Sequence, residues 1–448
     1  MADADAATPS RLTADRPTNV RLLVLGLACG LSFLLYLHRY AWGFVKKDVQ
    51  DEFGWDARVL GLLDSAFPLS YGLAQVPSGV LCDWFGARVL LGGSVLGWSA
   101  ALATLAVAGG GVTFAVARLT FGVAQASCYP VLTKVSKNWF PPGMRPAAQG
   151  LIATLSGRAG GAASFLLFGV LLGVVGLPWR GAVLLLAALG VGAGVLFLVL
   201  FRNTPREHPW ANPAEADLIT AGDPEAAHAT RSLLSWRTLL GNPGVLLLCL
   251  RSVFSNLADV LFVYWLPLYL LDVKKVSAVK TGWMAALPLL GGAVGGAVSG
   301  VLQSWLLVRT GDRRWSRSGV ALAGKLLAAG LMLSVLGLER PELIACVFLA
   351  VKFFSDWEQP AEWGAVTDIA GRNAATVFAT VNTAGAMGGA LAGPLIGMVL
   401  HAYRDGDALT AAGYNAVFVI IALEFLAAAA CWLFIDCRKP LAPVEGKP

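Results

Sequence analysis

The sequence predicts an all-α membrane protein with twelve transmembrane helices, arranged as two halves of six. Of the 448 residues, 56% are hydrophobic and only 14% are charged, whereas soluble domains carry about 25% charged residues. Apolar runs that can cross the hydrocarbon layer of a bilayer, which takes about 20 residues, recur along the chain. A polar, proline-rich stretch separates these runs into two equal groups. Lipid is therefore the expected surrounding of most of the chain.

The N-terminal half follows a polar segment, 1–20, which contains Pro9 and Pro17 and lacks the apolar core of a signal peptide. We expect this segment to be a cytoplasmic tail. Charges, prolines and glycines then bound six apolar runs within 21–201. The predicted spans are 21–44, 57–81, 88–108, 112–135, 147–175 and 181–201.

The stretch 202–242 combines mixed charges with four prolines, which favours a cytoplasmic linker between two membrane halves. The second half is predicted at 243–435, with a cytoplasmic tail at 436–448. Its predicted spans are 243–271, 281–307, 318–337, 342–366, 374–401 and 412–435.

Lys and Arg gather in the loops on the side of the N-terminus, so both termini are predicted to be cytoplasmic in an inner or plasma membrane. This distribution explains the net charge of +6 without a nucleic-acid partner. The seven cysteines are scattered singly and indicate neither disulfides nor zinc. We expect a monomer without metal or cofactor.

An internal repeat supports two related halves. Ser78-Gly79-Val80-Leu81 with Trp84 recurs as Ser299-Gly300-Val301-Leu302 with Trp305, each at the end of the second helix of its half. Two parallel repeats that bracket a site at the midplane are a known transporter plan, which works by alternating access. The sequence contains no G-x-x-x-x-G-K-[ST] phosphate loop, no H-E-x-x-H and no G-x-S-x-G. These absences favour a secondary transporter over an ATP-driven pump or an enzyme.

The segment that begins at Gly79 and continues through Asp83 and Gly86 to Arg88 has the pattern G-x-x-x-D-x-x-G-x-R. It resembles the signature loop of the major facilitator superfamily. The glycines permit close approach and a tight turn, and Asp83 can pair with an Arg and act as a gate. The second copy has Ser304 in place of the Asp, so the gate is expected to be asymmetric.

Further motifs resemble the anion:cation symporter family of that superfamily, over about 21–435. The resemblance implies the major facilitator fold and a substrate such as a hexuronate, aldonate, sialate, phthalate or glutamate, often carried with a proton or sodium. The motifs are Tyr36-Leu37-His38-Arg39, Arg118-x-x-x-Gly122, Pro130, Trp139-Phe140-Pro141-Pro142 with Arg145 and Gly150, Thr367-Asp368, Asn382-Thr383-Ala384-Gly385, and Gly388-Gly389.

Two positions depart from that family. Its first helix usually reads Asp-Arg where this chain has His38-Arg39, and its fourth helix usually reads R-x-x-x-G-x-x-E where this chain has Gln125. The family's two carboxylates are thought to carry the coupling proton. A glutamine amide cannot titrate, whereas an imidazole can near neutral pH. Proton coupling through the family's usual pair is therefore not expected.

Charged residues inside predicted spans need a partner or water, because each costs at least about 2.5 kcal/mol at the bilayer centre. Arg39 is expected to grip a carboxylate with two parallel hydrogen bonds. The alternative is that it extends to the outer headgroups. Arg118 and Arg158 could contact substrate, or could serve structural pairs between helices. Asp64 shares a helical stripe with Tyr71 and Gln75, and could replace the missing proton acceptor or neutralise a nearby Arg.

The tenth predicted helix is the most polar, and its Lys352 and Asp356, four residues apart, can pair internally. We expect Asp356 to be a counter-ion, with proton coupling as the alternative. Arg251, Asp259 and Lys325 carry the same ambiguity.

The sequence thus predicts a secondary transporter of a small organic anion. Arg39 is the expected anchor, and His38, Asp64 and Asp356 are the candidates for coupling. Neutral hydrogen bonds are expected from Tyr71, Gln75, Gln125 and Asn382. The alternatives are an organophosphate or phosphate exchanger, and a receptor that binds a nutrient without moving it.

Overall fold

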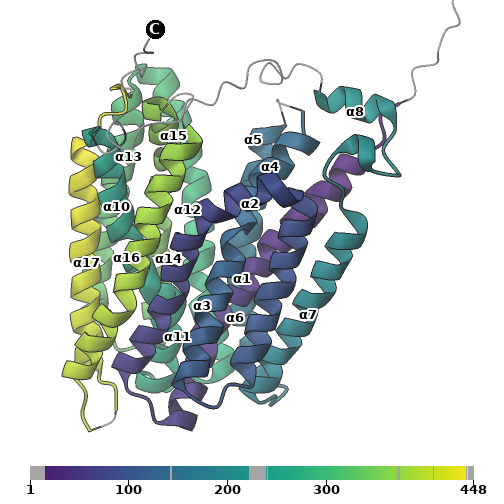
Figure 1. The fold of residues 1–448 in the computed structure, drawn as a ribbon. Helices are drawn as coiled ribbons and strands as arrows, with labels where there is room; N and C mark the ends of the chain where they lie inside the picture. Colours follow the sequence, from purple (N-terminus) through teal and green to yellow (C-terminus); the bar gives the residue numbers. More distant parts are fainter. Residues whose placement is uncertain are drawn as a thin grey trace, which may run out of the picture.

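The computed structural model describes residues 16–141, 144–220, 239, 241–370, 374–406, 408–439 and 441, without the side chains of 76, 83, 146, 147, 154, 374 and 375. Over these residues the chain is helical, and its sole strand-like feature is an isolated bridge in a loop. The helices run side by side through one bundle (Figure 1). The prediction of an all-α membrane protein is confirmed.

The N-terminal half comprises eight helical segments. The long helix α2 covers two predicted spans and is broken at Gly86, whose φ of 76° is accessible to glycine. The segments are α1 (Val20–Phe53), α2 (Ala57–Ala106), α3 (Gly111–Ala126), α4 (Cys128–Trp139), α5 (Arg145–Gln149), the π-helix η1 (Gly150–Ser156), α6 (Gly157–Gly173) and α7 (Trp179–Leu200).

The stretch predicted as a linker contains the 3-10 turn η2 (Pro205–Glu207) and α8 (Pro213–Thr220), and 221–238 and 240 lie outside the described residues. Glu215 of α8 is buried and accepts the backbone N–H groups of Val20 and Arg21. Because a carboxylate at a helix N-terminus satisfies its free donors, this contact fastens α8 to the start of α1.

The C-terminal half begins at Asn242, whose side chain caps α10 by accepting the N–H groups of Gly244 and Val245. Several of its helices contain π-helical or 3-10 turns. The segments are α10 (Pro243–Val260), η4 (Leu261–Trp265), α11 (Leu266–Leu268), η5 (Tyr269–Val273), α12 (Ala278–Thr310), η6 (Trp315–Gly319), α13 (Val320–Ser334), η7 (Val335–Gly337), α14 (Pro341–Ser355), α15 (Glu358–Ala370), α16 (Ala374–Ala402) and α17 (Ala411–Phe434).

Among the described residues, nine helical segments are long and apolar enough to cross a membrane. The first part of α2, the α3–α4 pair and the α14–α15 pair account for the three predicted spans outside that set. They contain prolines, helix interruptions or clustered charges. The arrangement is consistent with twelve spans.

The first helix is longer than expected. The sequence predicts 21–44, with Lys46 in an outer loop, but α1 continues to Phe53 and Lys46 is fully buried. The charges after position 45 suggested a loop. No helix breaker occurs before Gly54, which ends α1 in the left-handed conformation, with φ at 64°.

The two halves meet along α2 and α16 and along α6 and α12 (Figure 1). We call the end of the bundle that carries α8 the linker end. Near the opposite end, the halves approach so closely that a Cβ atom added to Gly61 would lie only 2.2 Å from the carbonyl oxygen of Gly393. The contact continues to Gln75 and Asn382, which are hydrogen-bonded. Closer to the linker end, Trp84 of α2 is 75% exposed.

Candidate functional site

Arg39 of α1 lies among aromatic rings in the middle of the N-terminal half. Its guanidinium carbon is 4.9 Å from the ring centre of Tyr36, and 4.8 Å from those of Phe67 and Tyr71. Such contacts stabilise a cation electrostatically. The side chain therefore points into the bundle, and the alternative of extension to the headgroups does not describe this structure.

The hydrogen bonding of Arg39 is incomplete. Its Nε donates to Oε1 of Gln125 over 3.0 Å, and Gln125 in turn donates from Nε2 to the carbonyl oxygen of Leu35. The buried Nη2 of Arg39 has no hydrogen-bond partner in the described part of the chain. No carboxylate of the described residues forms an ion pair with Arg39. The guanidinium therefore holds an uncompensated charge and a free donor.

Of the other predicted ligands, Tyr71 stacks on Phe67 with ring centres 5.5 Å apart. Gln75 accepts a hydrogen bond from Asn382 over 2.9 Å, which joins α2 to α16 across the two halves. The structure thus brings Tyr71 and Gln125 to Arg39, and ties Gln75 to Asn382.

The fourth-helix motif packs α3 against α2. A Cβ on Gly122 would lie 2.1 Å from Oγ of Ser70, so this position requires glycine. Arg118 is buried, donates from Nε to the carbonyl oxygen of Leu63, and leaves its Nη2 without a partner among the described residues. Its guanidinium carbon lies 5.6 Å from the centre of the Phe67 ring, which is also 4.8 Å from that of Arg39.

Asp64 takes part in a buried ion pair with Lys46. The two side chains, both 0% exposed, lie 2.7 Å apart, and Nε1 of Trp42 donates to the other carboxylate oxygen. Lys46 also lies 3.9 Å from the ring centre of Trp265, which belongs to the C-terminal half. The expectation that Asp64 neutralises an Arg is corrected, because its partner is a lysine on α1.

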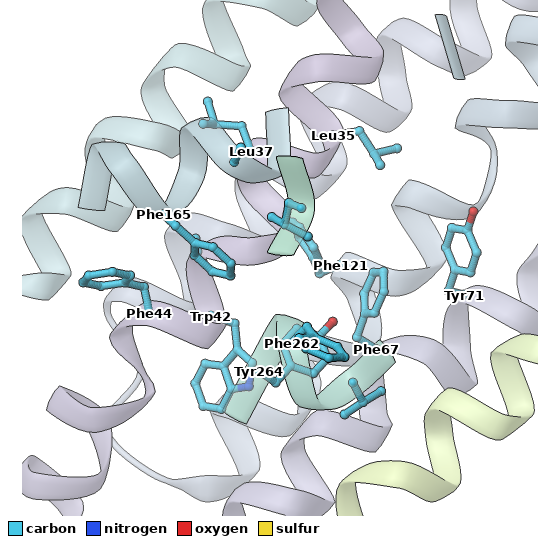
Figure 2. Close-up of a cluster of buried hydrophobic side chains, with 14 of the residues drawn as sticks. Leu35, Leu37, Trp42, Phe44, Phe67, Tyr71, Phe121, Phe165, Phe262 and Tyr264 are labelled. Carbon is cyan, nitrogen blue, oxygen red and sulfur yellow. The ribbon is translucent and has the colours of Figure 1, made fainter. Parts of the chain in front are cut away.

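Aromatic side chains from both halves surround this region. Figure 2 shows Trp42 of α1, Phe67 of α2, and Phe262 and Tyr264 of η4 gathered together. Tyr264 lies 5.6 Å from Lys46 and 5.3 Å from Arg118. The rings therefore separate the Lys46–Asp64 pair from Arg39 and join the halves on the side away from the linker end.

The side chain of His38 points away from that of Arg39. A Cβ on Gly190 of α7 would lie 2.6 Å from Cε1 of His38, and 2.1 Å from Oγ of Ser99. The imidazole therefore packs between α2 and α7, where it borders a small void with Trp42 and Arg118. His38 and Arg39 therefore point to different sides of α1, because a step of one residue turns the side chain about 100° around a helix.

Four charged side chains form a network between the halves. Arg158 of α6 pairs with Asp356, which caps the end of α14. Lys352 lies 2.8 Å from Asp356 and 2.6 Å from Asp259 of α10. The internal pair expected of Lys352 and Asp356 is present, and Arg158 and Asp259 extend it across the interface.

A second network lies wholly within the C-terminal half. Arg251 contacts Glu358 at 3.0 Å and Glu362 at 2.8 Å, and Lys325 contacts Glu358 at 2.8 Å. Trp432 donates to the same Glu358. The two cations balance the two carboxylates, and all four side chains are buried except that of Glu362, which is 12% exposed, so this network serves the packing of α10, α13 and α15.

The comparisons with known proteins agree with this geometry. Residues 28–393 match the family model described as "Major Facilitator Superfamily". The chain belongs to the major facilitator superfamily. It is 27% identical to a probable sulfoacetate transporter, SauU, of Cupriavidus necator, covering 95% of each chain. It is also 27% identical to a probable L-galactonate transporter of Escherichia coli K12, over 93% of this chain and 94% of the relative.

Solved structures of the superfamily share the fold. A bacterial homologue of the human lysosomal transporter Spinster, in an inward-facing and unoccupied conformation, aligns with a TM-score of 0.73 and 18% identity, over 93% of this chain and 96% of that one. The nucleoside transporter NupG, as its D323A mutant, aligns with a TM-score of 0.67 and 13% identity, over 92% and 99%. The expected fold is confirmed.

The superfamily's signature loop lies at the linker end. Gly86 supplies the sharp turn, and Arg88 donates from Nε to the carbonyl oxygen of Leu198 on α7 over 2.8 Å. A Cβ on Gly79 would have no neighbour within 4 Å, so the close approach expected there is absent. The side chain of Asp83 lies outside the described residues, and its role as a gate stays a prediction.

Sequence reasoning missed several neighbours of the anchor. Phe67, Tyr129 and Tyr264 are apolar or aromatic residues within apolar runs, where nothing distinguishes them from core residues. Tyr36 belonged to a motif but was given no role, although its ring contacts Arg39. Asn256, exposed in the middle of α10, was also missed, although a polar amide within a span was a usable signal.

Proposed function

We propose that the protein is a secondary transporter of a small organic anion and that Arg39 binds the anionic group. The observation that carries this proposal is the uncompensated guanidinium of Arg39, with its Nη2 free of any partner among the described residues. Removing a charge from water is costly unless it is paired, so a site that holds such a cation favours an anionic ligand. The rings of Tyr36, Phe67 and Tyr71 orient the guanidinium without neutralising it.

The family's fourth-helix motif has Glu at the position of Gln125, and this difference supports the same proposal. A carboxylate at this position, 3.0 Å from Nε of Arg39, would pair with the cation, whereas the amide of Gln125 leaves its charge to the substrate. The relatives named for sulfoacetate, galactonate and galactarate/D-glucarate transport agree with an acidic substrate.

In this proposal the two halves, 21–201 and 243–435, move relative to each other to give alternating access. The glycine contacts of Gly61 and Gly393 close the end away from the linker. The linker end, where Lys and Arg are frequent, faces the cytoplasm in this proposal, which places both termini inside and makes the described conformation inward-facing. Coupling by His38, Asp64 or Asp356 to a proton or sodium gradient is a further part of the proposal.

Uptake into proteoliposomes tests the function. The purified protein should accumulate radiolabelled galactonate, galactarate or sulfoacetate above the level of empty vesicles, and unlabelled acids should compete. Sugar phosphates and inorganic phosphate serve as the contrasting substrates. Preferred uptake of a phosphate would instead favour an exchanger, and binding without flux would favour a receptor.

A further inference from the structure

The network of Arg158, Asp259, Lys352 and Asp356 is only partly buried. The side chain of Asp259 is 40% exposed and that of Arg158 is 19% exposed, although both belong to predicted membrane spans. One helical turn before Asp259, the exposed Asn256 lies on the same face of α10. By contrast, Arg251 and Glu358 of the second network are 2% and 4% exposed. The first network therefore borders accessible space between the halves.

Two tyrosines of α1 lie between Arg39 and α6. The rings of Tyr36 and Tyr40 form an edge contact with centres 5.7 Å apart, and Arg39 lies over Tyr36. On the other side, these rings pack against α6 at Gly157 and Gly161, where a Cβ would lie 2.8 Å from Tyr36 and 2.7 Å from Tyr40.

Arg158 follows Gly157 in α6, so the tyrosine pair lies beside both Arg39 and the segment that carries Arg158. The phenol of Tyr40 lies within electrostatic reach of both guanidinium groups. Two cations thus lie near the same tyrosine pair.

We infer that Arg158 and Lys352 form a second anion-binding site, and that the preferred substrate is a small organic dianion with an acidic group at each end. This inference rests on the proposed function, in which Arg39 holds the first acidic group. The second group, a carboxylate or a sulfonate, displaces Asp259 from Lys352.

The donors for such a group are present. Lys352 has three ammonium protons and uses two contacts, to Asp259 and Asp356. The guanidinium of Arg158 has five N–H donors, and its ion pair with Asp356 engages only part of them. Asp259 is exposed enough to keep its charge in water after displacement, whereas Asp356 is buried and stays as the counter-ion.

The balance of charge favours a two-ended acid. The four side chains of the network carry two positive and two negative charges, so the network is neutral while Asp259 remains paired. Arg39 is uncompensated and attracts one acidic group alone. A second acidic group gains affinity only by competing with Asp259, which makes Asp259 the residue that tunes preference for dianions.

The test compares galactarate with galactonate. Galactarate has a carboxylate at the end where galactonate has a hydroxymethyl group. The measurement is the ratio of their affinities for the purified full-length protein, by calorimetry. We expect the wild type to bind galactarate more tightly, by about tenfold, since hydrogen bonds to charged groups are worth that much. Asp259→Asn should raise the ratio by about a further tenfold, because it removes the competing carboxylate.

Arg158→Gln should lower the ratio towards one. Lys47→Gln, which removes a positive charge from the end of α1 outside this space, is the matched control and should leave the ratio unchanged. Asp259→Asn keeps the inference testable if Arg158→Gln does not fold, since it predicts a gain in affinity that mere damage does not produce.

The outcomes separate the two proposals. If the wild type binds neither of these acids nor sulfoacetate, the proposed function fails. If galactonate binds through Arg39 and galactarate binds no better, the proposed function stands and the second site is refuted. An affinity ratio that is the same in the wild type, Asp259→Asn and Arg158→Gln would also refute it.

Discussion

Lys46 and Asp64 form a fully buried ion pair, 2.7 Å between Nζ and Oδ2, at the junction of the two halves. Lys46 comes from α1 and Asp64 from α2, and the ring of Trp265 from the C-terminal half covers the ammonium group at 3.9 Å. On the other side, a Cβ on Gly393 would lie 2.7 Å from Cβ of Asp64. When the halves separate at this end, water reaches the pair, so its energy depends on the transport state.

We predict that Asp64→Asn destabilises the protein, because it leaves Lys46 as an unpaired buried charge at a cost of about 3 to 5 kcal/mol. Lys46→Gln combined with Asp64→Asn should recover most of that loss, as measured by thermal unfolding in detergent. If Asp64 also carries the coupling proton, the stabilised double variant should exchange substrate but fail to accumulate it uphill. Uphill accumulation by the double variant would clear Asp64 of coupling and leave His38 and Asp356.

We predict that Arg39→Lys loses most of the substrate affinity, by about tenfold or more, because an ammonium cannot reproduce the planar two-bond grip of a guanidinium. The amide oxygen of Gln125 would also lose the hydrogen bond that Nε of Arg39 donates to it. Arg58→Lys, at an exposed position at the start of α2, is the matched control. Binding near the wild-type level in Arg39→Lys would remove Arg39 from the site.

Gln125→Glu tests whether the free charge of Arg39 is what attracts the substrate. The new carboxylate would pair with the guanidinium and compete with the anion, so affinity at neutral pH should fall by about tenfold. Protonation removes this competition, and affinity should therefore recover as the pH falls. Gln125→Ala separates the effect of charge from the loss of the amide, and should show no such recovery. A variant that binds as tightly as the wild type at neutral pH would argue against charge as the attraction.

Gly393→Ala should hinder closure of the halves at the end away from the linker. Its Cβ would meet the carbonyl oxygen of Gly61 at 2.2 Å, which is too close for backbone atoms that cannot rotate away. We expect cysteine labelling at that end to increase and labelling at the linker end to decrease. Gly93→Ala is the control, because its Cβ would have no neighbour within 4 Å. Unchanged labelling in Gly393→Ala would mean that local shifts at Gly61 and Gly393 accommodate the methyl group and the halves stay in place.

The sequence alone was sufficient for the class and the approximate spans, and it singled out Arg39 as the candidate anchor. A bilayer imposes a length on every apolar run, and a cation such as Arg39 within such a run needs an explanation that the sequence makes visible. The helical stripe of Asp64, Tyr71 and Gln75 was also readable, because residues seven and eleven apart share a face. The ends of helices were less certain: the charges after position 45 suggested a loop, yet α1 continues to Gly54.

Only the tertiary structure decided which polar groups meet. Spacing along one helix says which face a residue occupies, but it contains no information on which helix covers that face. Asn382 reaches Gln75, Lys46 neutralises Asp64, and Arg158 crosses the interface to Asp356. The physical reason is that a buried charge is satisfied by whichever partner the packing brings within hydrogen-bond distance, and that packing depends on close approaches such as Gly61 on Gly393, between residues far apart in the chain.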